Sequence, residues 1–407
     1  MRICTLSDVS KSGGAAIAAN RVAQAIMKKG HSVSRISSDG SEYSDLDEHV
    51  LLVGRKYLLF SHFLKFSRSS NLTEFLRIKE LSRQLACILR QIKPNVINIH
   101  NLHSASWPIE LVATALRHAP VSWTLHDCWS FSGRYYPTHS PPPSERTTRR
   151  IELFWNSLNK FNLSKGLSAI TPSGWMQMAA SAGYWKAYSV QKIHNPVPAE
   201  YFEEVDHLSA QRALGLNSGK PVVLIIAGNL AEERKGGLIV KDALAHLADD
   251  EVQFLVIGNG LKPSEIPKNG KSLGFISDKV TLRIAYAAAD LLLHPAPVDN
   301  LPNTVAEAMC CGTPVLAFNT GGLPEMIIPG KSGWLVKQQS SQSIITELRN
   351  LLESRNFELL REKTRDIATN LFSEERVSEE YLSHFRSYTT RLNPQNEVQI
   401  KNGGIKS

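Results

Sequence analysis

The chain has 407 residues, 42% of them hydrophobic, and a formal net charge of +8 at pH 7. This length is too great for one hydrophobic core and favours two domains of ordinary size. The five cysteines are scattered and form no C-x-x-C pair, which argues against a disulfide framework and against a structural zinc site. A reducing, cytoplasmic setting is therefore the simplest expectation.

Membrane-spanning and nucleic-acid-binding classes are also disfavoured. No apolar run approaches the roughly 18 residues that a membrane-spanning helix needs. The first residues, MRICTLSDVS, indicate a strand and lack the regions of a signal peptide. The positive charge suits nucleic acid, an anionic membrane surface or a phosphorylated substrate. Because no nucleic-acid-binding module is recognisable, we expect no nucleic-acid partner.

A glycine turn follows the first predicted strand, residues 2–7, and leads into a helix that ends near Lys29, with Gly30 as its stop. Gly13 and Gly14 lie in this turn. A strand, a glycine turn and a helix in this order are what a phosphate or sugar cradle needs. The pattern is not the G-x-G-x-x-G dinucleotide fingerprint, and a plain tight turn would explain the glycines as well.

Residues 55–68 mix aromatic, leucine and basic side chains. An amphipathic helix on an anionic membrane has this composition. A helix half buried against a sheet has it too, so the segment leaves both interpretations open. Peripheral contact with the inner face of the cytoplasmic membrane is one expectation that follows.

Two successive predicted strands, Val96–His100 and Val121–Leu125, end in turns that carry histidine. The carboxyl ends of parallel strands meet at the sheet edge where ligands bind. The first turn contributes His103, and the second contributes His126 and Asp127. A lone histidine is usually a structural residue, and no G-x-S-x-G or H-E-x-x-H motif indicates a catalytic triad or a metal site.

A long loop, residues 128–146, follows these histidines and contains Arg134 and a run of prolines. Loops of this length are usually functional or mobile, so this one is a candidate lid over a substrate. Further along, residues 193–198 predict a strand that runs into a proline-stiffened linker. The domain boundary is placed there, after residue 197.

The second domain begins near Pro221 with an all-apolar strand, Val222–Ala227, which suits a central parallel position. The strand ends in a glycine turn, residues 228–237, that carries Arg234 and Lys235. Cations beside a glycine turn at a strand end suit a diphosphate, although ordinary surface charges would give the same pattern.

Residues 291–325 hold the densest pattern: a buried strand, a proline-rich loop with Asp299, a helix from Asn303 to about Cys311, and a second strand. The first turn of a helix favours an anion, whereas the carboxylates of Asp299 and Glu307 suit hydroxyl groups. A ligand with a phosphate and sugar hydroxyls is therefore indicated. For either acid alone, a solvated surface residue is the ordinary interpretation.

This stretch resembles the donor-site signature of retaining glycosyltransferases of the GT-B fold, glycosyltransferase family 4. The resemblance lies in Asp299-x7-Glu307, Ala308-Met309, Gly312-Thr313-Pro314-Val315 and Gly321-Gly322-x-Pro324-Glu325. The signature has Glu at both ends of the first spacing, where this chain has Asp299. The run Val298–Pro302 resembles the exopolysaccharide and colanic-acid-type branch, and Trp123 to Gly133 is similar to the family's acceptor-side motif.

The resemblance implies an α/β, GT-B architecture with two Rossmann-like domains that face each other across a cleft. It implies an N-terminal acceptor-side domain, a C-terminal nucleotide-sugar donor domain and a helix that crosses back to the first domain. The expected bounds are 1–197, 198–372 and 373–392, with a frayed tail at 393–407. The implied activity is transfer of a hexosyl-type group from a nucleotide-diphosphate sugar to a glycan or lipid-linked acceptor, with retention of configuration, in polysaccharide or glycoconjugate biosynthesis.

The resemblance also implies roles for individual residues. Asn229 stands where the family has an arginine, and Arg234 would replace that charge. No metal or other cofactor is expected, because cations and helix N–H groups would hold the diphosphate. The expected catalytic residues are His126, Lys235, Arg234 and Asp299. The expected donor-binding residues are Gly13, Gly14, Asn229, Gly274, Phe275, Asn300, Leu301, Pro302, Asn303, Thr304 and Glu307. The expected acceptor-side residues are His103, Asp127 and Arg134.

Two alternatives stay open at this point. A GT-B-fold nucleotide-sugar epimerase would share the nucleotide site but need no acceptor. A non-catalytic sugar-nucleotide or glycan-binding protein is favoured only by Asp299 and Asn229, the two departures from the family pattern. The sequence leaves open the donor base and sugar, the acceptor, the linkage and the oligomeric state.

Overall fold

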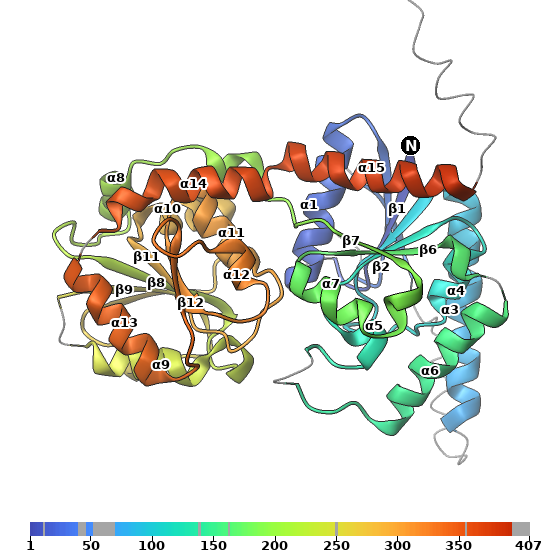
Figure 1. The fold of residues 1–407 in the computed structure, drawn as a ribbon, viewed down its shortest axis with the longest axis horizontal. Coiled ribbons are helices and arrows are strands. Elements are labelled where there is room, and N and C mark those ends of the chain that lie inside the picture. Colours follow the sequence, from blue (N-terminus) through green and yellow to red (C-terminus); the bar gives the residue numbers. More distant parts are fainter. Residues whose placement is uncertain are drawn as a thin grey trace, which may run out of the picture. The chain divides into compact units, whose positions relative to one another are not determined.

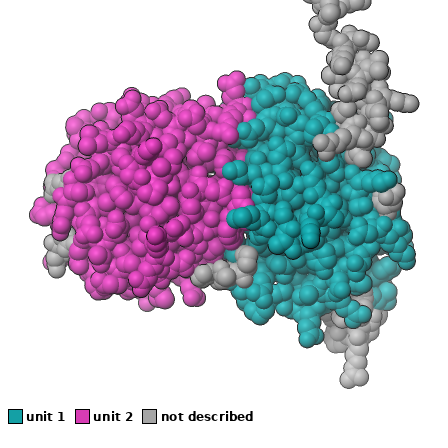
Figure 2. All heavy atoms as spheres, viewed as in Figure 1, with its two compact units in different colours: residues 1–172, 176–193, 377–407 teal, residues 173–175, 194–376 magenta. Residues whose placement is uncertain are grey.

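A computed structural model describes residues 1–10, 13–39, 46–51, 70–136, 140–161, 163–248, 251–354 and 356–392. The segment 55–68, for which the sequence left a membrane-surface helix and a half-buried helix open, and the tail, 393–407, lie outside these residues. The described chain forms two compact units (Figure 2). Unit 1 comprises Met1–Pro172, Met176–Ile193 and Val377–Ser407, and unit 2 comprises Ser173–Trp175 and His194–Arg376.

Unit 1 is built on a seven-stranded parallel sheet in the order β3-β2-β1-β4-β5-β6-β7. Helices lie on both faces of this sheet (Figure 1). The strands are β1 (Arg2–Leu6), β2 (Ser32–Ser37), β3 (Asp47–Val50), β4 (Val96–Ile99), β5 (Val121–Thr124), β6 (Leu167–Thr171) and β7 (Ser189–Lys192). The helices include α1 (Gly14–Lys28), α3 (Ser70–Ile92), α4 (Leu111–Leu116), α5 (Trp129–Ser132), α6 (Glu145–Lys160), α7 (Gly174–Ser181) and α15 (Glu374–Leu392).

The C-terminal helix α15 is part of unit 1 from Val377 onward. Val377, Tyr381 and Phe385 are buried in one core cluster with Ile3 of β1 and Val96 of β4. These apolar residues recur every four positions along α15, so they share one face of the helix. The helix therefore belongs to the hydrophobic core of the unit that the N-terminal residues build.

Unit 2 is built on a six-stranded parallel sheet in the order β10-β9-β8-β11-β12-β13. The strands are β8 (Val222–Asn229), β9 (Gln253–Asn259), β10 (Gly270–Gly274), β11 (Leu291–His294), β12 (Val315–Phe318) and β13 (Gly333–Val336). The helices are α8 (His207–Ala213), α9 (Gly237–His246), α10 (Lys279–Ala288), α11 (Asn303–Cys310), α12 (Leu323–Met326), α13 (Ser341–Ser354) and α14 (Glu358–Phe372).

Alternating side chains of strand β8 enter two separate core clusters. Val222 and Leu224 pack with residues of α10 and α11, whereas Val223 and Ile225 pack with residues of α9 and α13. Successive side chains of a strand point to opposite faces, so a strand buried on both faces reads as one apolar run. The predicted pair of Rossmann-like α/β domains, each with a parallel sheet, is confirmed.

One predicted strand was wrong. Residues 193–198 do not form the expected strand, and β7 ends before them, at Lys192. Strand β7 lies at the sheet edge and is largely exposed, so it lacks the apolar run that marks a buried strand. Among the described helices, none combines the length and the apolar character that crossing a membrane requires.

Candidate functional site

The turn between β11 and α11 in unit 2 holds an ion pair between the buried Asp299 and the partly exposed Lys235. Lys235 Nζ lies 2.8 Å from Asp299 Oδ2, and the backbone N–H of Asn300 donates to Asp299 Oδ1 at 2.9 Å. Burial raises the pKa of Asp299, but the charge of Lys235 and the hydrogen bonds from Lys235 and Asn300 oppose it, and the pKa is lowered overall. Asp299 is therefore an ionised carboxylate next to a cation.

His294, the last residue of β11, lies beside the same carboxylate, with Nε2 3.7 Å from Asp299 Oδ2. Burial lowers its pKa to about 4, although the charge of Asp299 opposes the shift. The imidazole is therefore neutral at pH 7, and Lys235 supplies the positive charge of this cluster. Sequence reasoning missed His294 as a site residue, although it directly ends the predicted strand.

Gly321 and Gly322, which follow strand β12, lie against the backbone of the turn that carries Asp299. A Cβ atom on Gly321 would lie 1.9 Å from the carbonyl oxygen of Asp299, and one on Gly322 would lie 1.8 Å from that of Asn300. The N–H of Gly322 donates to the carbonyl of Asp299 at 3.0 Å. The Gly-Gly pair is thus a requirement of close backbone packing, which only glycine permits.

Glu307 lies on α11 and is only 6% exposed, so the solvated-helix interpretation of this residue was wrong. The hydroxyl of Tyr286, in α10, donates to Glu307 Oε2 at 2.7 Å. A buried carboxylate needs such a partner, because an unpaired buried charge is strongly unfavourable. Burial, followed by the charge of Glu307, raises the pKa of Tyr286 well above its usual value, so the tyrosine stays a donor.

The two cations of the glycine turn after β8, Arg234 and Lys235, are adjacent in the sequence but have different partners. Lys235 reaches Asp299, whereas Arg234 is half exposed and pairs with Glu232 at 2.8 Å. The side chain of Asn229 accepts a hydrogen bond from Ala231 N at 3.1 Å and so shapes the turn.

The other predicted donor residues are backbone features. Pro302 is the N-cap of α11, and Asn303 and Thr304 form its first turn, where N–H groups lack partners within the helix. Leu301 and Asn300 are buried, and Ser173 Oγ donates to Asn300 Oδ1 at 2.5 Å.

Phe275 follows Gly274 at the end of β10 and is an exposed ring. Gly274 has φ +66°, and a Cβ atom there would meet nothing within 4 Å. The backbone of this glycine is therefore open to a ligand, and an L side chain would strain the turn.

In unit 1, histidines from neighbouring strand ends form a hydrogen-bonded pair. His100 Nδ1 and His126 Nε2 lie 2.8 Å apart, and their rings stack. Burial lowers the pKa of His126 to about 4 and that of His100 well below its usual value. Both rings are neutral at pH 7. His100 was not predicted as a site residue. It follows strand β4 at the same sheet edge where His126 follows strand β5.

His103 forms an ion pair with Asp127, with Nε2 3.2 Å from Oδ2. Burial lowers the pKa of His103. The charge of Asp127 and its hydrogen bond outweigh this effect, so the pKa of His103 is raised overall. The ring stacks on Trp129 and meets the edge of Tyr135, at centroid distances of 5.1 Å in both cases. The predicted acceptor-side residues His103 and Asp127 therefore lie together, with aromatic rings beside them.

A pocket in unit 1 contains these side chains. It is lined by His100, Asn101, Leu102, His103, Trp123, Leu125, His126, Asp127, Trp129 and Ser130. The other predicted residues of this unit, Gly13, Gly14 and Arg134, do not line the pocket. Arg134 is partly exposed in the following loop, and Gly13 is the N-cap of α1 with φ +90°, followed by Gly14 as the first helical residue.

Asp8, which sequence reasoning missed, fixes the loop that carries His103. Asp8 is fully buried just after β1, and Oδ2 accepts a hydrogen bond from Ala105 N at 2.7 Å. Its negative charge also contributes to the raised pKa of His103. No sequence pattern marks this role, because residues 8 and 105 meet only when β1 and β4 pair.

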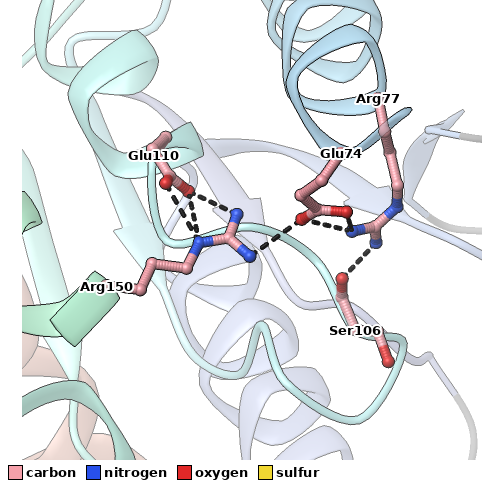
Figure 3. A network of polar contacts seen from close by, with 5 residues as sticks. All are labelled: Glu74, Arg77, Ser106, Glu110 and Arg150. Carbon is pink, nitrogen blue, oxygen red and sulfur yellow. Dashed lines mark hydrogen bonds and ion pairs between the residues drawn. The ribbon is translucent and has the colours of Figure 1, made fainter. Parts of the chain in front are cut away.

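An ion-pair network that includes Arg77 also contacts this loop, at Ser106 (Figure 3). Arg77, on α3, donates to the carbonyl oxygen of Ser106, which has a positive φ of 55°. Arg150, on α6, lies 2.8 Å from Glu74 and 2.7 Å from Glu110. A positive φ is unfavourable for serine, so these contacts hold the loop in a conformation that it would not adopt alone.

Within the described residues, no group of three or more His, Cys, Asp or Glu side chains has the arrangement of a metal site. Within each unit, charged side chains of the site lie in a pair, Lys235 with Asp299 in unit 2 and His103 with Asp127 in unit 1. The site residues can thus offer carboxylates, a lysine ammonium, neutral imidazoles and helix N–H groups.

Comparison with known proteins gives consistent results along the chain. The sequence family described as Glycosyltransferase Family 4 matches residues 12–200, and that described as Glycosyl transferases group 1 matches residues 221–354. The fold and these two consecutive matches define the chain as a GT-B glycosyltransferase-superfamily protein. Within it, the matches support the group 1 and family 4 branch.

Curated relatives are similar over part of their length. A D-inositol 3-phosphate glycosyltransferase of Segniliparus rotundus is 32% identical over 37% of this chain and 36% of its own length. The sulfoquinovosyl transferase SQD2 of Arabidopsis thaliana is 26% identical over 77% of this chain and 58% of its own length. The chain thus spans less than two thirds of these relatives.

Solved structures share the fold. A glycosyltransferase from Rickettsia africae has a TM-score of 0.71 at 16% identity, over 95% of this chain and 98% of that one. HepE of Anabaena, solved in complex with UDP and glucose, has a TM-score of 0.68 at 20% identity, over 95% of this chain and 99% of that one.

Proposed function

We propose that this protein transfers a hexosyl-type group from a nucleotide-diphosphate sugar to a glycan or lipid-linked acceptor, with retention of configuration. The observation that carries the proposal is the partly buried Lys235–Asp299 pair at the turn before α11. It combines a cation for a diphosphate with a carboxylate for sugar hydroxyls. We further propose a role in polysaccharide or glycoconjugate biosynthesis, in the cytoplasm, with peripheral contact with an anionic membrane.

Lys235 and the N–H groups of the first turn of α11 would stabilise the departing diphosphate. Breaking the bond between the anomeric carbon and the phosphate oxygen leaves negative charge on the phosphate and positive charge on the sugar ring. A lysine ammonium and a helix N-terminus are suited to the first of these charges. Arg234 would add a second cation after leaving Glu232, from which its guanidinium is separable because it is half exposed.

Asp299 would orient the donor sugar through its hydroxyls, and Glu307 would accept hydrogen bonds from the ribose. The neutral ring of His126 would contact the transferred sugar. In the retaining mechanism that we propose, the acceptor hydroxyl attacks the face from which the diphosphate departs. The leaving phosphate oxygen takes the hydroxyl proton, so no protein base is needed and charge stays balanced.

The names of relatives support a nucleotide-sugar donor but not one base. One relative is named a GDP-mannose-dependent alpha-mannosyltransferase. HepE was solved with UDP-glucose, and Starch Synthase IV of Arabidopsis thaliana was solved with ADP and acarbose. The donor base of this chain is therefore a question for experiment.

Thermal unfolding of the purified protein with UDP, GDP, ADP, NAD or no ligand, each with and without EDTA, tests the proposal. A ligand at about 100 times its Kd adds roughly 2.7 kcal/mol of stability. We expect a shift with one nucleoside diphosphate that EDTA leaves unchanged. A shift with NAD alone, or none with any nucleotide, would contradict the donor site, and a shift that EDTA abolishes would contradict the metal-independent mechanism.

A further inference from the structure

The last turn of helix α10 brings the side chain of Tyr286 to Glu307 on helix α11. Tyr286 is fully buried, and its hydroxyl donates to Glu307 Oε2 at 2.7 Å. Because Glu307 is itself only 6% exposed, this hydrogen bond lies in the core of unit 2 and competes little with water. The place of the tyrosine hydroxyl therefore helps to decide where the carboxylate points.

Side chains from two other parts of unit 2 hold this end of α10. The carbonyl groups at the C-terminus of a helix need partners from outside the helix. Thr313 Oγ1 donates to the carbonyl oxygen of Tyr286 at 2.6 Å. Arg361, on α14, donates from Nη2 to the carbonyl of Ala287 and from Nη1 to that of Ala289, at 2.9 Å each. Tyr286 thus lies on an anchored backbone, which is what precise placement of a functional side chain requires.

Stability alone does not account for the pair of Tyr286 and Glu307. The tyrosine shares its hydrophobic cluster with Leu292, Val305 and Met309, so its surroundings are apolar. In such surroundings, apolar residues of similar size are often as stabilising as a buried polar pair, or more so. A buried carboxylate with an anchored donor is instead expected where a ligand has to meet that carboxylate in a fixed orientation.

We propose that Tyr286 is a positioning residue for the donor: its hydroxyl holds the Glu307 carboxylate in the orientation that receives the ribose hydroxyls of the nucleotide. The inference rests on the proposed function, which places Glu307 at the ribose. A glutamate side chain without this partner would lose more rotamer freedom when the nucleotide binds. Because Tyr286 orders the carboxylate beforehand, less entropy is lost on binding and the affinity for a ribose is higher.

Binding of nucleotides with and without ribose hydroxyls tests the inference. The probes are UDP, GDP and ADP, each compared with its 2′,3′-dideoxy form by isothermal titration calorimetry on the full-length protein. We expect the wild type to bind its preferred nucleotide more tightly in the ribose form. Tyr286→Phe should lower this ratio of affinities by about fivefold, the scale of one hydrogen bond, and change the affinity for the dideoxy form by less than about twofold.

Three further variants connect the change to Glu307. In the Glu307→Ala background, adding Tyr286→Phe should leave the ratio unchanged, because no carboxylate remains to be positioned. Tyr381→Phe is the matched control, because Tyr381 is another fully buried tyrosine, in the core of unit 1, and the ratio should stay at its wild-type value. If Tyr286→Phe does not fold, Glu307→Gln with and without Tyr286→Phe gives the comparison without a buried charge, and the phenylalanine should again lower the ratio.

The outcomes separate this inference from the proposed function. Failure of every nucleoside diphosphate to bind the wild type would count against the proposed function. Equal affinities of the wild type for the ribose and dideoxy forms would leave the nucleotide site in place and overturn the inference. An equal loss of affinity for both forms in Tyr286→Phe, or a loss of the ratio that persists in the Glu307→Ala background, would show that the tyrosine does not act through the carboxylate and would overturn it too.

Discussion

At the scale of single residues, Lys235 has two roles: it keeps Asp299 ionised, and in the proposed reaction it binds the diphosphate. Asp299 is buried, and burial alone would raise its pKa, so its ionised state depends on the lysine 2.8 Å away. An ammonium at this place can also serve the diphosphate that leaves in the proposed reaction. Removing it therefore acts on both the donor and the carboxylate.

We expect Lys235→Ala to lower the transfer rate by about 10²-fold, the scale of removing one partner of a charge that develops in the transition state. Steady-state kinetics with the identified donor would measure it. Lys241→Ala is a matched control, because Lys241 is a lysine of the same unit that pairs with Glu265 at 2.9 Å, away from Asp299. Wild-type rates in the Lys235 variant would remove this residue from the mechanism.

The pH dependence of stability is also set by individual residues. The pKa of His126 is about 4 in the folded protein, against an ordinary value of 6.5. Between these values the unfolded chain binds more protons than the folded one, so stability falls as pH decreases from 6.5 towards 4. His100 and His294, whose pKa values are also lowered by burial, act in the same direction.

We therefore expect the loss of unfolding free energy between pH 7 and pH 5 to be smaller in His126→Gln, by up to about 2 kcal/mol. Glutamine removes the titration and keeps a hydrogen-bonding partner for His100. Urea unfolding at the two pH values gives the difference. His246→Gln, at an exposed histidine of α9, should leave the loss unchanged, and equal losses in both variants and wild type would contradict the assignment.

At the scale of elements, the sequence predicts the strand–turn–helix around the site well. The helix expected from Asn303 to about Cys311 is α11, which ends at Cys310. Its end was predictable because Gly312 has φ +81°, a conformation that glycine tolerates, and because a proline follows shortly after. These are local properties of neighbouring residues, which a sequence displays directly.

Contacts between distant residues were not predictable. The burial of Glu307 depends on Tyr286, and the role of Asp8 depends on a backbone group near residue 105. The partners of the two cations also differ, because Arg234 turns to its neighbour Glu232 while Lys235 crosses to another turn. Such pairings are set by the packing of whole strands and helices, which single-sequence patterns do not encode.

Helix α15 shows what one element contributes to unit 1. His384 Nε2 lies 3.1 Å from the hydroxyls of Ser122 and Ser168, and Nδ1 lies 2.9 Å from Gln191 Oε1. The histidine is 4% exposed. It thus joins strands β5 and β6 of the sheet to the C-terminal helix by buried hydrogen bonds.

We expect His384→Ala to lower the free energy of unfolding by about 2–4 kcal/mol, because a cavity and several unpaired polar atoms would remain. Chemical denaturation followed by circular dichroism measures the change. Arg386→Ala, on the exposed side of the same helix, should change stability by no more than about 0.5 kcal/mol. Equal effects of the two substitutions would show that His384 does not anchor the helix.

At the scale of the whole molecule, the chemistry is divided between the units. The site of unit 2 has the lysine, the helix N-terminus and the carboxylates that suit a nucleotide sugar, whereas the pocket of unit 1 has neutral histidines, aromatic rings and the His103–Asp127 ion pair. Each group is assembled at the carboxyl edge of its own parallel sheet. We therefore expect a charged nucleotide and an acceptor to slow hydrogen exchange in different parts of the chain.

Hydrogen exchange measured by mass spectrometry on the full-length protein tests this division. The nucleoside diphosphate found by thermal unfolding should slow exchange in peptides that cover residues 229–237 and 294–307, because a bound ligand suppresses the opening of the backbone that it contacts. Lys235→Ala should reduce this protection at equal nucleotide concentration, and Lys241→Ala should retain it. Protection by the nucleotide in peptides 100–107 and 126–135, without protection in 229–237 and 294–307, would reverse the assignment of donor and acceptor to the two units.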